Sequence, residues 1–319
     1  MKELTRRECA DWLLARDHFA ILTHRKPDGD TLGSAAGLCR GLRSLGKTAS
    51  VLENPEVTPL YQPLVEGLTK PHPEEGDILV AVDVAADNML PQAFAELRNS
   101  IDLRIDHHGS GREYTPFELV EPESAACAQI IWEVLLDMGA EPDKYLAEAI
   151  YVGVSTDTGC FRFANTNAHA FDVAGDCAAA GADVFEWNRK LFDTNSITKL
   201  RLQSWVVDNM RLMCGGKIAM CVLPEEVEKA LGVSEDDLQN LSSFLRSVER
   251  VCVSALLRCA GENNTKVSVR SVPGYNAASI CERFGGGGHA GAAGCSIRKP
   301  LQEAAKELEQ VLIDWETQG

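Results

Sequence analysis

The stretch DILVAVDVA, residues 77–85, decides the fold of this chain. It is a continuous apolar run, typical of a parallel strand that is buried on both faces. Strand-like segments at 19–24, 48–53 and 101–106 alternate with helical periods at 31–46, 124–139 and 143–155. Strands separated by helices predict an α/β fold with a doubly wound parallel sheet, whose ligands bind beyond the carboxyl ends of the strands.

The pattern changes after about residue 185. Residues 186–212 are helical and charged without a strand partner, which indicates a linker between two domains. Strand-like segments at 217–223, 250–259 and 266–272 follow, and a helix over about 300–315 closes the chain. We therefore expect a first domain at 1–185, a helical linker at 186–212 and a smaller α/β domain at 213–319, with the active-site cleft between the domains.

Composition limits the partners and the compartment. The chain has 319 residues, with 31 Lys and Arg against 47 Asp and Glu, for a net charge of −16. That charge argues against a protein that grips long duplex nucleic acid or an anionic membrane. The N-terminus lacks the apolar core of a signal peptide, and no stretch approaches a membrane span. Eleven cysteines without a C-x-x-C pair indicate buried thiols in a reducing compartment, so we expect a cytoplasmic protein.

Acidic and histidine residues gather in four clusters, each expected at the end of a strand. The clusters are His24, Asp28 and Asp30; Asp83; Asp106, His107 and His108; and Asp157. Taken alone, an Asp-x-Asp loop is typical of a turn with a helix N-cap, and a single aspartate is typical of a cap or loop. Together, on one edge of one sheet, they indicate a metal site. Oxygen and imidazole ligands favour Mn²⁺ or Mg²⁺, and this many ligands suits two ions roughly 3.5–4 Å apart.

A fifth cluster lies in the second domain, where residues 284–294 read FGGGGHAGAAG. Consecutive glycines before a histidine are expected to expose a row of backbone N–H groups that suits a phosphate. Residues 251–300 contain six basic and two acidic residues, so this stretch is +4 within an acidic chain. Arg270, near the end of a strand, is the best candidate for a phosphate clamp, whereas Arg298 and Lys299 are expected to be a solvated surface pair.

These motifs, in this order, resemble the DHH phosphoesterase superfamily with its associated C-terminal DHHA1 domain. The resemblance covers nearly the whole chain and is greatest to the compact nanoRNase/pAp phosphatase (NrnA-like) group. It implies one metal ion at His24, Asp28 and Asp83 and another at Asp30, Asp83, His107 and Asp157. It also implies catalytic roles for Asp106, which would orient His107, and for His108, which would face the scissile phosphate. The implied substrate-binding residues are Arg270, Gly286, Gly287, Gly288 and His289.

The resemblance implies a metal-dependent phosphohydrolase in which a hydroxide activated by two metal ions attacks phosphorus. Its expected substrates are short oligoribonucleotides (nanoRNA) and 3′-phosphoadenosine 5′-phosphate (pAp), and its expected ion is Mn²⁺, with Mg²⁺ or Co²⁺ as alternatives. One alternative keeps the chemistry but takes cyclic or linear dinucleotides such as c-di-AMP or pApA. Another alternative is a nucleotide-binding sensor without catalysis. The preferred substrate, the cleavage direction and the oligomeric state, a homodimer included, stay open.

Overall fold

The computed structural model describes residues 1–109, 114–238 and 240–318, and these fall into two compact units. The first unit comprises Met1–Thr194 and the second Asn195–Gly319. The division after Thr194 lies inside the segment 186–212 that the sequence indicates as a linker. Each unit has its own sheet and its own hydrophobic core.

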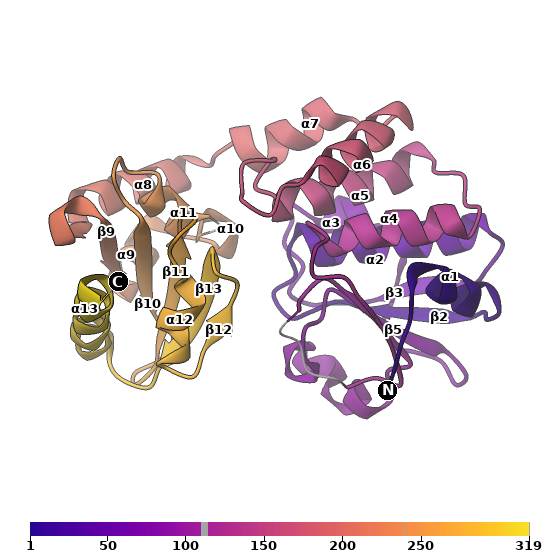
Figure 1. The fold of residues 1–319 in the computed structure, drawn as a ribbon, viewed down its shortest axis with the longest axis horizontal. Helices are drawn as coiled ribbons and strands as arrows, with labels where there is room; N and C mark the ends of the chain where they lie inside the picture. The colour runs from indigo at the N-terminus through magenta and orange to yellow at the C-terminus, as the bar shows by residue number, and fades with distance from the viewer. Residues whose placement is uncertain (110–113, 239, 319) are drawn as a thin grey trace. The chain divides into compact units, whose positions relative to one another are not determined.

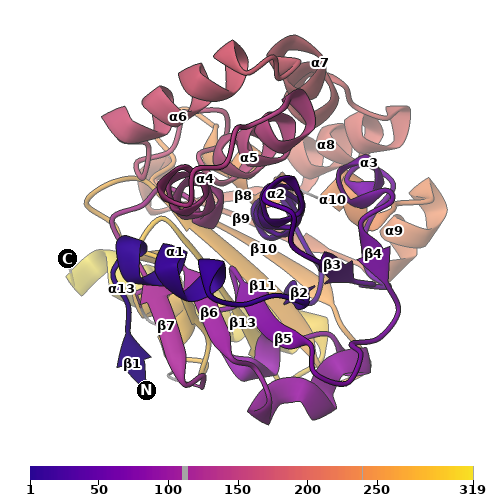
Figure 2. The same ribbon diagram turned by 90° about the vertical axis from the view of Figure 1, so that its right-hand side faces the viewer.

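The first unit is built on a parallel sheet. Among the described residues seven strands pair in the order β1-β7-β6-β5-β2-β3-β4, and Figure 2 shows β7, β6, β5, β2 and β3 side by side. The strands are β1 (Lys2–Glu3), β2 (Phe19–Leu22), β3 (Ala49–Leu52), β4 (Thr69–Lys70), β5 (Ile78–Val82), β6 (Leu103–Asp106) and β7 (Phe117–Val120). The α/β class and the parallel sheet predicted from the sequence are confirmed.

Helices cover the two faces of this sheet unequally. Helices α1, α2 and α4 pack on one face, and α5 and α6 form a further layer outside α2 and α4 (Figure 1). The short 3₁₀ helices η1 and η2 pack on the other face, against a smaller core. The helices of the unit are α1 (Arg6–Leu14), α2 (Gly29–Ser44), α3 (Gln62–Val65), η1 (Asp87–Met89), η2 (Gln92–Asn99), α4 (Cys127–Asp137), α5 (Lys144–Asp157), α6 (Ala168–Ala179), α7 (Val184–Asn188) and the π-helical η3 (Arg189–Asp193).

Close packing of α2 against α5 brings two distant parts of the sequence together. A Cβ added to Gly33 of α2 would lie 2.3 Å from the carbonyl oxygen of Ala149, so only glycine allows this approach. A Cβ added to Gly153 of α5 would likewise lie 3.0 Å from a carboxylate oxygen of Asp30. The contact therefore places the carboxyl end of α5, where Asp157 lies, beside the first turn of α2.

The second unit is a mixed sheet with helices on both faces. Its strands pair in the order β12-β13-β11-β10-β9-β8; α12 and α13 cover one face, and α8 and α11 pack on the other. The strands are β8 (Arg211–Met213), β9 (Ile218–Leu223), β10 (Val253–Cys259), β11 (Thr265–Ser271), β12 (Gly287–Gly288) and β13 (Ala292–Ile297). The helices are α8 (Ile197–Asn209), η4 (Cys214–Gly216), α9 (Glu225–Leu231), α10 (Glu235–Leu238), α11 (Leu241–Arg246), α12 (Ala277–Glu282) and α13 (Leu301–Gln318).

Three short strands of the first sheet, β1, β4 and β7, are absent from the sequence prediction. Two of them have only two residues, which is too short for a clear period of two, and β7 has four residues that include the charged Glu118. One expectation about the site is wrong as well: Asp157 ends helix α5 rather than a strand. Within the described residues, no helix combines the length and the apolar character needed to cross a membrane.

Candidate metal centre

The candidate ligands of the first unit lie where β2, β5 and β6 end. These three strands are neighbours in a parallel sheet, so their carboxyl ends lie at the same edge. His24 follows β2, Asp83 follows β5, and Asp106 is the last residue of β6. The opening of α2 adds Asp28 and Asp30, and the end of α5 adds Asp157.

These side chains form three overlapping groups of His and Asp that could hold a metal ion. The groups are His24, Asp28 and Asp83; Asp30, His107 and Asp157; and Asp83, Asp106, His107 and His108. His24 Nε2 lies 3.6 Å from Asp28 Oδ1 and 3.6 Å from Asp83 Oδ2. His107 Nε2 lies 3.7 Å from Asp83 Oδ1 and 3.7 Å from Asp157 Oδ2. The structure thus brings every predicted metal-ligating residue to one place, with Asp83 central.

Asp83 combines an unusual backbone conformation with a buried carboxylate. Its backbone has φ 57°, a left-handed conformation that non-glycine residues rarely adopt and that occurs most often at functional sites. Its carboxylate is only 4% exposed, and Oδ1 has no hydrogen-bond partner. A buried carboxylate oxygen without a donor is unfavourable unless a cation binds it. This orphaned oxygen, within a set of imidazole and carboxylate donors, fits a divalent cation.

The shifted pKa values indicate that the carboxylates of this cluster repel one another and lack enough positive charge to balance them. Burial, together with repulsion from Asp83 and Asp157, raises the pKa of Asp30 well above its ordinary value. Burial and the charges of Asp83 and Asp28 do the same to the pKa of Asp157. Burial lowers the pKa of His24, but Asp28 and Asp83 outweigh that effect and raise it overall. Carboxylates whose negative charge is this poorly compensated form a site for cations.

Asp30 is also fixed by the helix packed against it. Its Oδ2 accepts the backbone N–H of Cys127 at 2.7 Å, and its Oδ1 accepts that of Ala128 at 2.9 Å. Both donors belong to the first turn of α4, whose N-cap residue, Ala126, makes no side-chain hydrogen bond. Asp30 therefore satisfies the N-terminus of α4 from a distant part of the chain, which fixes its carboxylate rigidly.

Asp106 contacts a different histidine side chain from the one expected. Its Oδ1 accepts the backbone N–H groups of His107 and His108 and lies 2.8 Å from His108 Nδ1. His107 Nδ1 lies 3.2 Å from the carbonyl oxygen of Ser124 instead. The expectation that Asp106 orients the imidazole of His107 is therefore wrong, because the β6 turn presents that carboxylate to His108. An Nδ1–H···O=C bond to Ser124 turns Nε2 of His107 toward Asp83 and Asp157, where it can ligate a metal ion.

Arg104 on β6, which was not predicted from the sequence, holds the carboxylate of Asp106 in place. Its guanidinium is 2% exposed and donates to Asp106 Oδ2 from Nε at 3.1 Å and from Nη2 at 2.7 Å. Nη1 lies 3.4 Å from Glu118 Oε2 on β7. Burial raises the pKa of Asp106, but His108 and Arg104 outweigh it and lower that pKa to about 2. A charged residue inside the apolar strand IDLRID was the signal available in the sequence.

Asn165 is a second residue missed from the sequence. Its Nδ2 donates to the carbonyl oxygens of Ala125 and Asp157, at 3.0 and 3.1 Å, and lies 3.4 Å from Asp157 Oδ2. It therefore ties the end of α5 to the loop before α4. An isolated asparagine in a polar loop gives no sequence signal.

In the second unit the glycine-rich segment forms a tight hairpin. Gly287 and Gly288 pair with Gly294 and Ala293 of β13. The N–H groups of Gly285 and Gly286 bond the carbonyls of Glu282 and Cys281 at the end of α12, and that of His289 bonds Ala292. The expectation of a row of free N–H groups is therefore wrong for Gly285, Gly286 and His289, since α12 and the hairpin use them.

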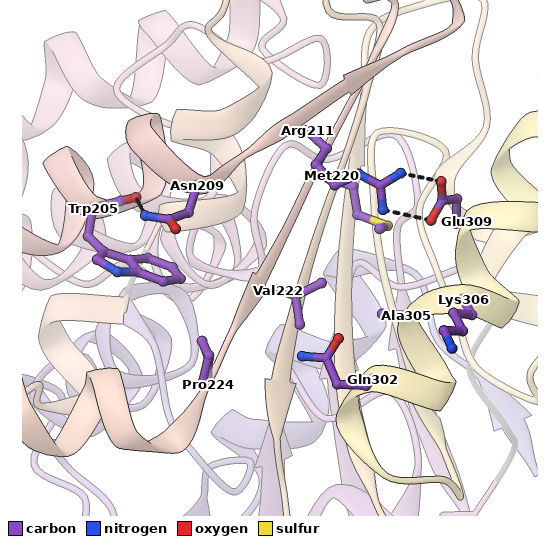
Figure 3. A pocket seen from close by; sticks show the side chains of 10 residues that line it. All are labelled: Trp205, Asn209, Arg211, Met220, Val222, Pro224, Gln302, Ala305, Lys306 and Glu309. Atoms are coloured by element: carbon purple, nitrogen blue, oxygen red, sulfur yellow. Dashed lines mark hydrogen bonds and ion pairs between the residues drawn. The ribbon is translucent and has the colours of Figure 1, made fainter.

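Arg270 lies on β11 of the same unit, and its Nη1 donates to the carbonyl oxygen of Val269. A separate hollow of about 330 Å³ lies beside β9, lined by Trp205, Met220 and Val222 among others (Figure 3). Arg211 in this lining is paired with Glu309, as Figure 3 shows. Because Glu309 neutralises Arg211, the one arginine among the described lining residues, we do not assign the hollow to the substrate.

Comparisons with known proteins agree with this geometry. The DHH family N-terminal domain matches residues 18–154, and the DHHA1 domain matches residues 215–317. A bifunctional oligoribonuclease and PAP phosphatase NrnA from Thermus thermophilus is 33% identical over 87% of this chain and 83% of its own length. A cyclic-di-AMP phosphodiesterase, PdeA, from Listeria monocytogenes is 26% identical over 92% of this chain but 47% of its own length. An exopolyphosphatase-related protein of known structure from Bacteroides fragilis superposes with a TM-score of 0.87 at 25% identity, covering 98% of this chain and 96% of that one.

Proposed function

Because this chain belongs to the DHH family and carries a DHHA1 domain, we propose that it is a metal-dependent phosphohydrolase of short oligoribonucleotides and pAp. The observation that carries the proposal is Asp83, whose buried Oδ1 accepts no hydrogen bond and lies within the groups of His and Asp. The relative from Thermus thermophilus, whose name carries both activities, supports the choice of substrates.

The donor set divides between two ions. His24, Asp28 and Asp83 would hold one, and Asp30, Asp83, His107 and Asp157 would hold the other. When bound, two divalent cations supply a nucleophile at neutral pH and neutralise charge that develops on a phosphoryl group. We propose Mn²⁺ as the ion and the cytoplasm as the compartment, since the donors are oxygen and imidazole and the chain has eleven cysteines without a C-x-x-C pair.

The chain's own residues orient and stabilise the reacting phosphate. Asp106 fixes the His108 ring through Nδ1, so the opposite nitrogen, Nε2, is presented to the substrate. Burial lowers the pKa of His108, but the hydrogen bond of its ring to Asp106 and the nearby carboxylate of Asp83 outweigh it and raise that pKa to about 11. A protonated His108 can donate a hydrogen bond to a phosphoryl oxygen where negative charge develops. Arg270, Gly286, Gly287, Gly288 and His289 would bind another part of the substrate.

A second candidate is hydrolysis of cyclic or linear dinucleotides such as c-di-AMP or pApA. The similarity to the phosphodiesterase from Listeria monocytogenes favours it. A sensor without catalysis is disfavoured, because every predicted ligand is present and brought together.

The test uses the full-length chain after dialysis against EDTA. With Mn²⁺ restored, we expect turnover of a labelled diribonucleotide and of pAp. Asp157→Asn should abolish it, and Asp172→Asn, a change at a side chain that is 77% exposed, should leave it unchanged. No turnover of either substrate would overturn the proposal. A higher kcat/KM for c-di-AMP or pApA would support the second candidate instead.

A further inference from the structure

Basic side chains lie on one face of the second unit's sheet. On β11, Val267 and Val269 point into the core beneath α12 and α13. The alternate residues Lys266, Ser268 and Arg270 therefore point to the opposite face, where α8 and α11 pack. The residues paired with them on β13, which include Gly294 and Ser296, are small and exposed. This face, which we call the β11 face, is open beside Arg270.

Helix α11 brings a second arginine to the same place. The Ser254 hydroxyl on β10 donates to the carbonyl oxygen of Ser242 in α11, at 2.8 Å, and Ser254 is the strand partner of Arg270. Arg246 lies one helical turn after Ser242, on the same side of α11. The first turn of α11 is thus anchored next to Arg270, and Arg246 follows it along the helix.

Neither arginine has a counter-charge among the described residues. Arg246 makes no hydrogen bond or ion pair there, and Arg270 makes only its bond to the Val269 carbonyl, although both are half-buried. Arg258, on the same face, is the contrast: its guanidinium forms two 2.9 Å hydrogen bonds to Glu228. Burial and the positive charge of Arg246 both lower the pKa of Arg270, which agrees with two cations close together.

We propose that Arg246 and Arg270 together bind a terminal phosphate monoester of the substrate, and that Arg246 makes the site selective for this dianion over a phosphodiester. A monoester carries about −1.5 to −2 charges at pH 7, whereas a diester carries one, so the monoester matches two guanidinium groups. The inference rests on the proposed function, which supplies the nucleotide class of the substrate. It assigns phosphate recognition to these two side chains rather than to the backbone of the glycine-rich segment, because the N–H groups of Gly285, Gly286 and His289 already donate to backbone carbonyls.

The test measures binding without turnover. The full-length chain, kept in EDTA, is titrated calorimetrically with 5′-AMP, with the methyl phosphodiester of AMP and with adenosine. We expect wild type to bind AMP most tightly of the three. Arg246→Met should weaken AMP binding by ~10-fold or more and reduce the preference for AMP over its methyl ester, because a charge-assisted bond is lost. The affinity of Arg246→Lys for AMP should lie between those of wild type and Arg246→Met.

Arg298→Met is the matched control, since it removes an exposed arginine of the same unit. It should bind all three ligands as wild type does. The inference is overturned if Arg246→Met binds AMP as tightly as wild type, or if it loses affinity for adenosine and the methyl ester equally. If Arg246→Met does not fold, Arg246→Lys makes the same comparison with the charge retained and the planar fork removed. Because no turnover is measured, failure of the proposed hydrolysis would be seen separately.

Discussion

Replacing Arg104 with methionine should destabilise the first unit strongly. The change removes the guanidinium group from two buried carboxylates: Asp106, whose side chain is fully buried, and Glu118, which is 5% exposed. Breaking a buried ion pair by removing one partner costs about 3–5 kcal/mol. For a unit of this size, 1 kcal/mol corresponds to roughly 2–4 °C in the unfolding midpoint. We therefore expect Arg104→Met to lower that midpoint by about 6–20 °C.

The assay is thermal unfolding of the full-length chain in EDTA, followed by circular dichroism and calorimetry. Arg7→Met is the control, because Arg7 is 66% exposed and makes only surface contacts among the described residues, an ion pair with Asp11 and a hydrogen bond to the carbonyl oxygen of Asp137. The pKa of Asp106 is lowered from 3.8 to about 2, so its ion-pair stabilisation is complete above about pH 4 and is lost as the pH falls through 2. The gap between wild type and Arg104→Met should therefore be constant from pH 7 to 5 and shrink below pH 4. A gap no larger than that of the Arg7→Met control would refute the reasoning.

Three further predictions concern single residues. Asp83→Asn should remove the rise in unfolding midpoint that Mn²⁺ gives wild type, about 2.7 kcal/mol of stabilisation at 100 times the dissociation constant; an unchanged rise would place the metal elsewhere. Gly288→Ala should destabilise the second unit by about 2 kcal/mol in urea unfolding, because Gly288 has φ 142° and its added Cβ would lie 2.5 Å from Ala292 O; Gly287→Ala, with nothing within 4 Å, should be tolerated, and equal effects would contradict this. Asn165→Ala should weaken Mn²⁺ binding by ~10-fold in equilibrium dialysis, because the end of α5 loses its tie; wild-type affinity would exclude a supporting role.

The parallel sheet was predictable because its central strands lie in short strand-like segments that alternate with helical periods. Residues 78–82 form β5 inside the quoted stretch, and 103–106 form β6 inside IDLRID. The clustering of the candidate ligands followed from the same reasoning, since parallel strands share an edge. The two-residue strands β1 and β4 are too short to show a period, and β7, whose four residues include the charged Glu118, pairs with strands that are distant from it or unpredicted in the sequence.

The residues around the ligands were harder to predict than the ligands themselves. Arg104 and Asn165 act through side-chain contacts that depend on how β6, β7 and α5 pack. Ser124 contacts His107 through its backbone carbonyl oxygen, and such a contact does not depend on the residue type, so the sequence gives no sign of it. Arg246 was missed because an arginine at the end of a short helix is typical of a surface position, and only the register of β10 and β11 brings it near Arg270.

The most direct test of the central claim is a Mn²⁺ titration of the EDTA-dialysed full-length chain, with bound metal and diribonucleotide hydrolysis measured in the same samples. The account predicts no hydrolysis without metal, activity that saturates as about two ions bind per chain, and loss of both binding and hydrolysis in Asp83→Asn. Hydrolysis in EDTA, or full activity in Asp83→Asn, would contradict it.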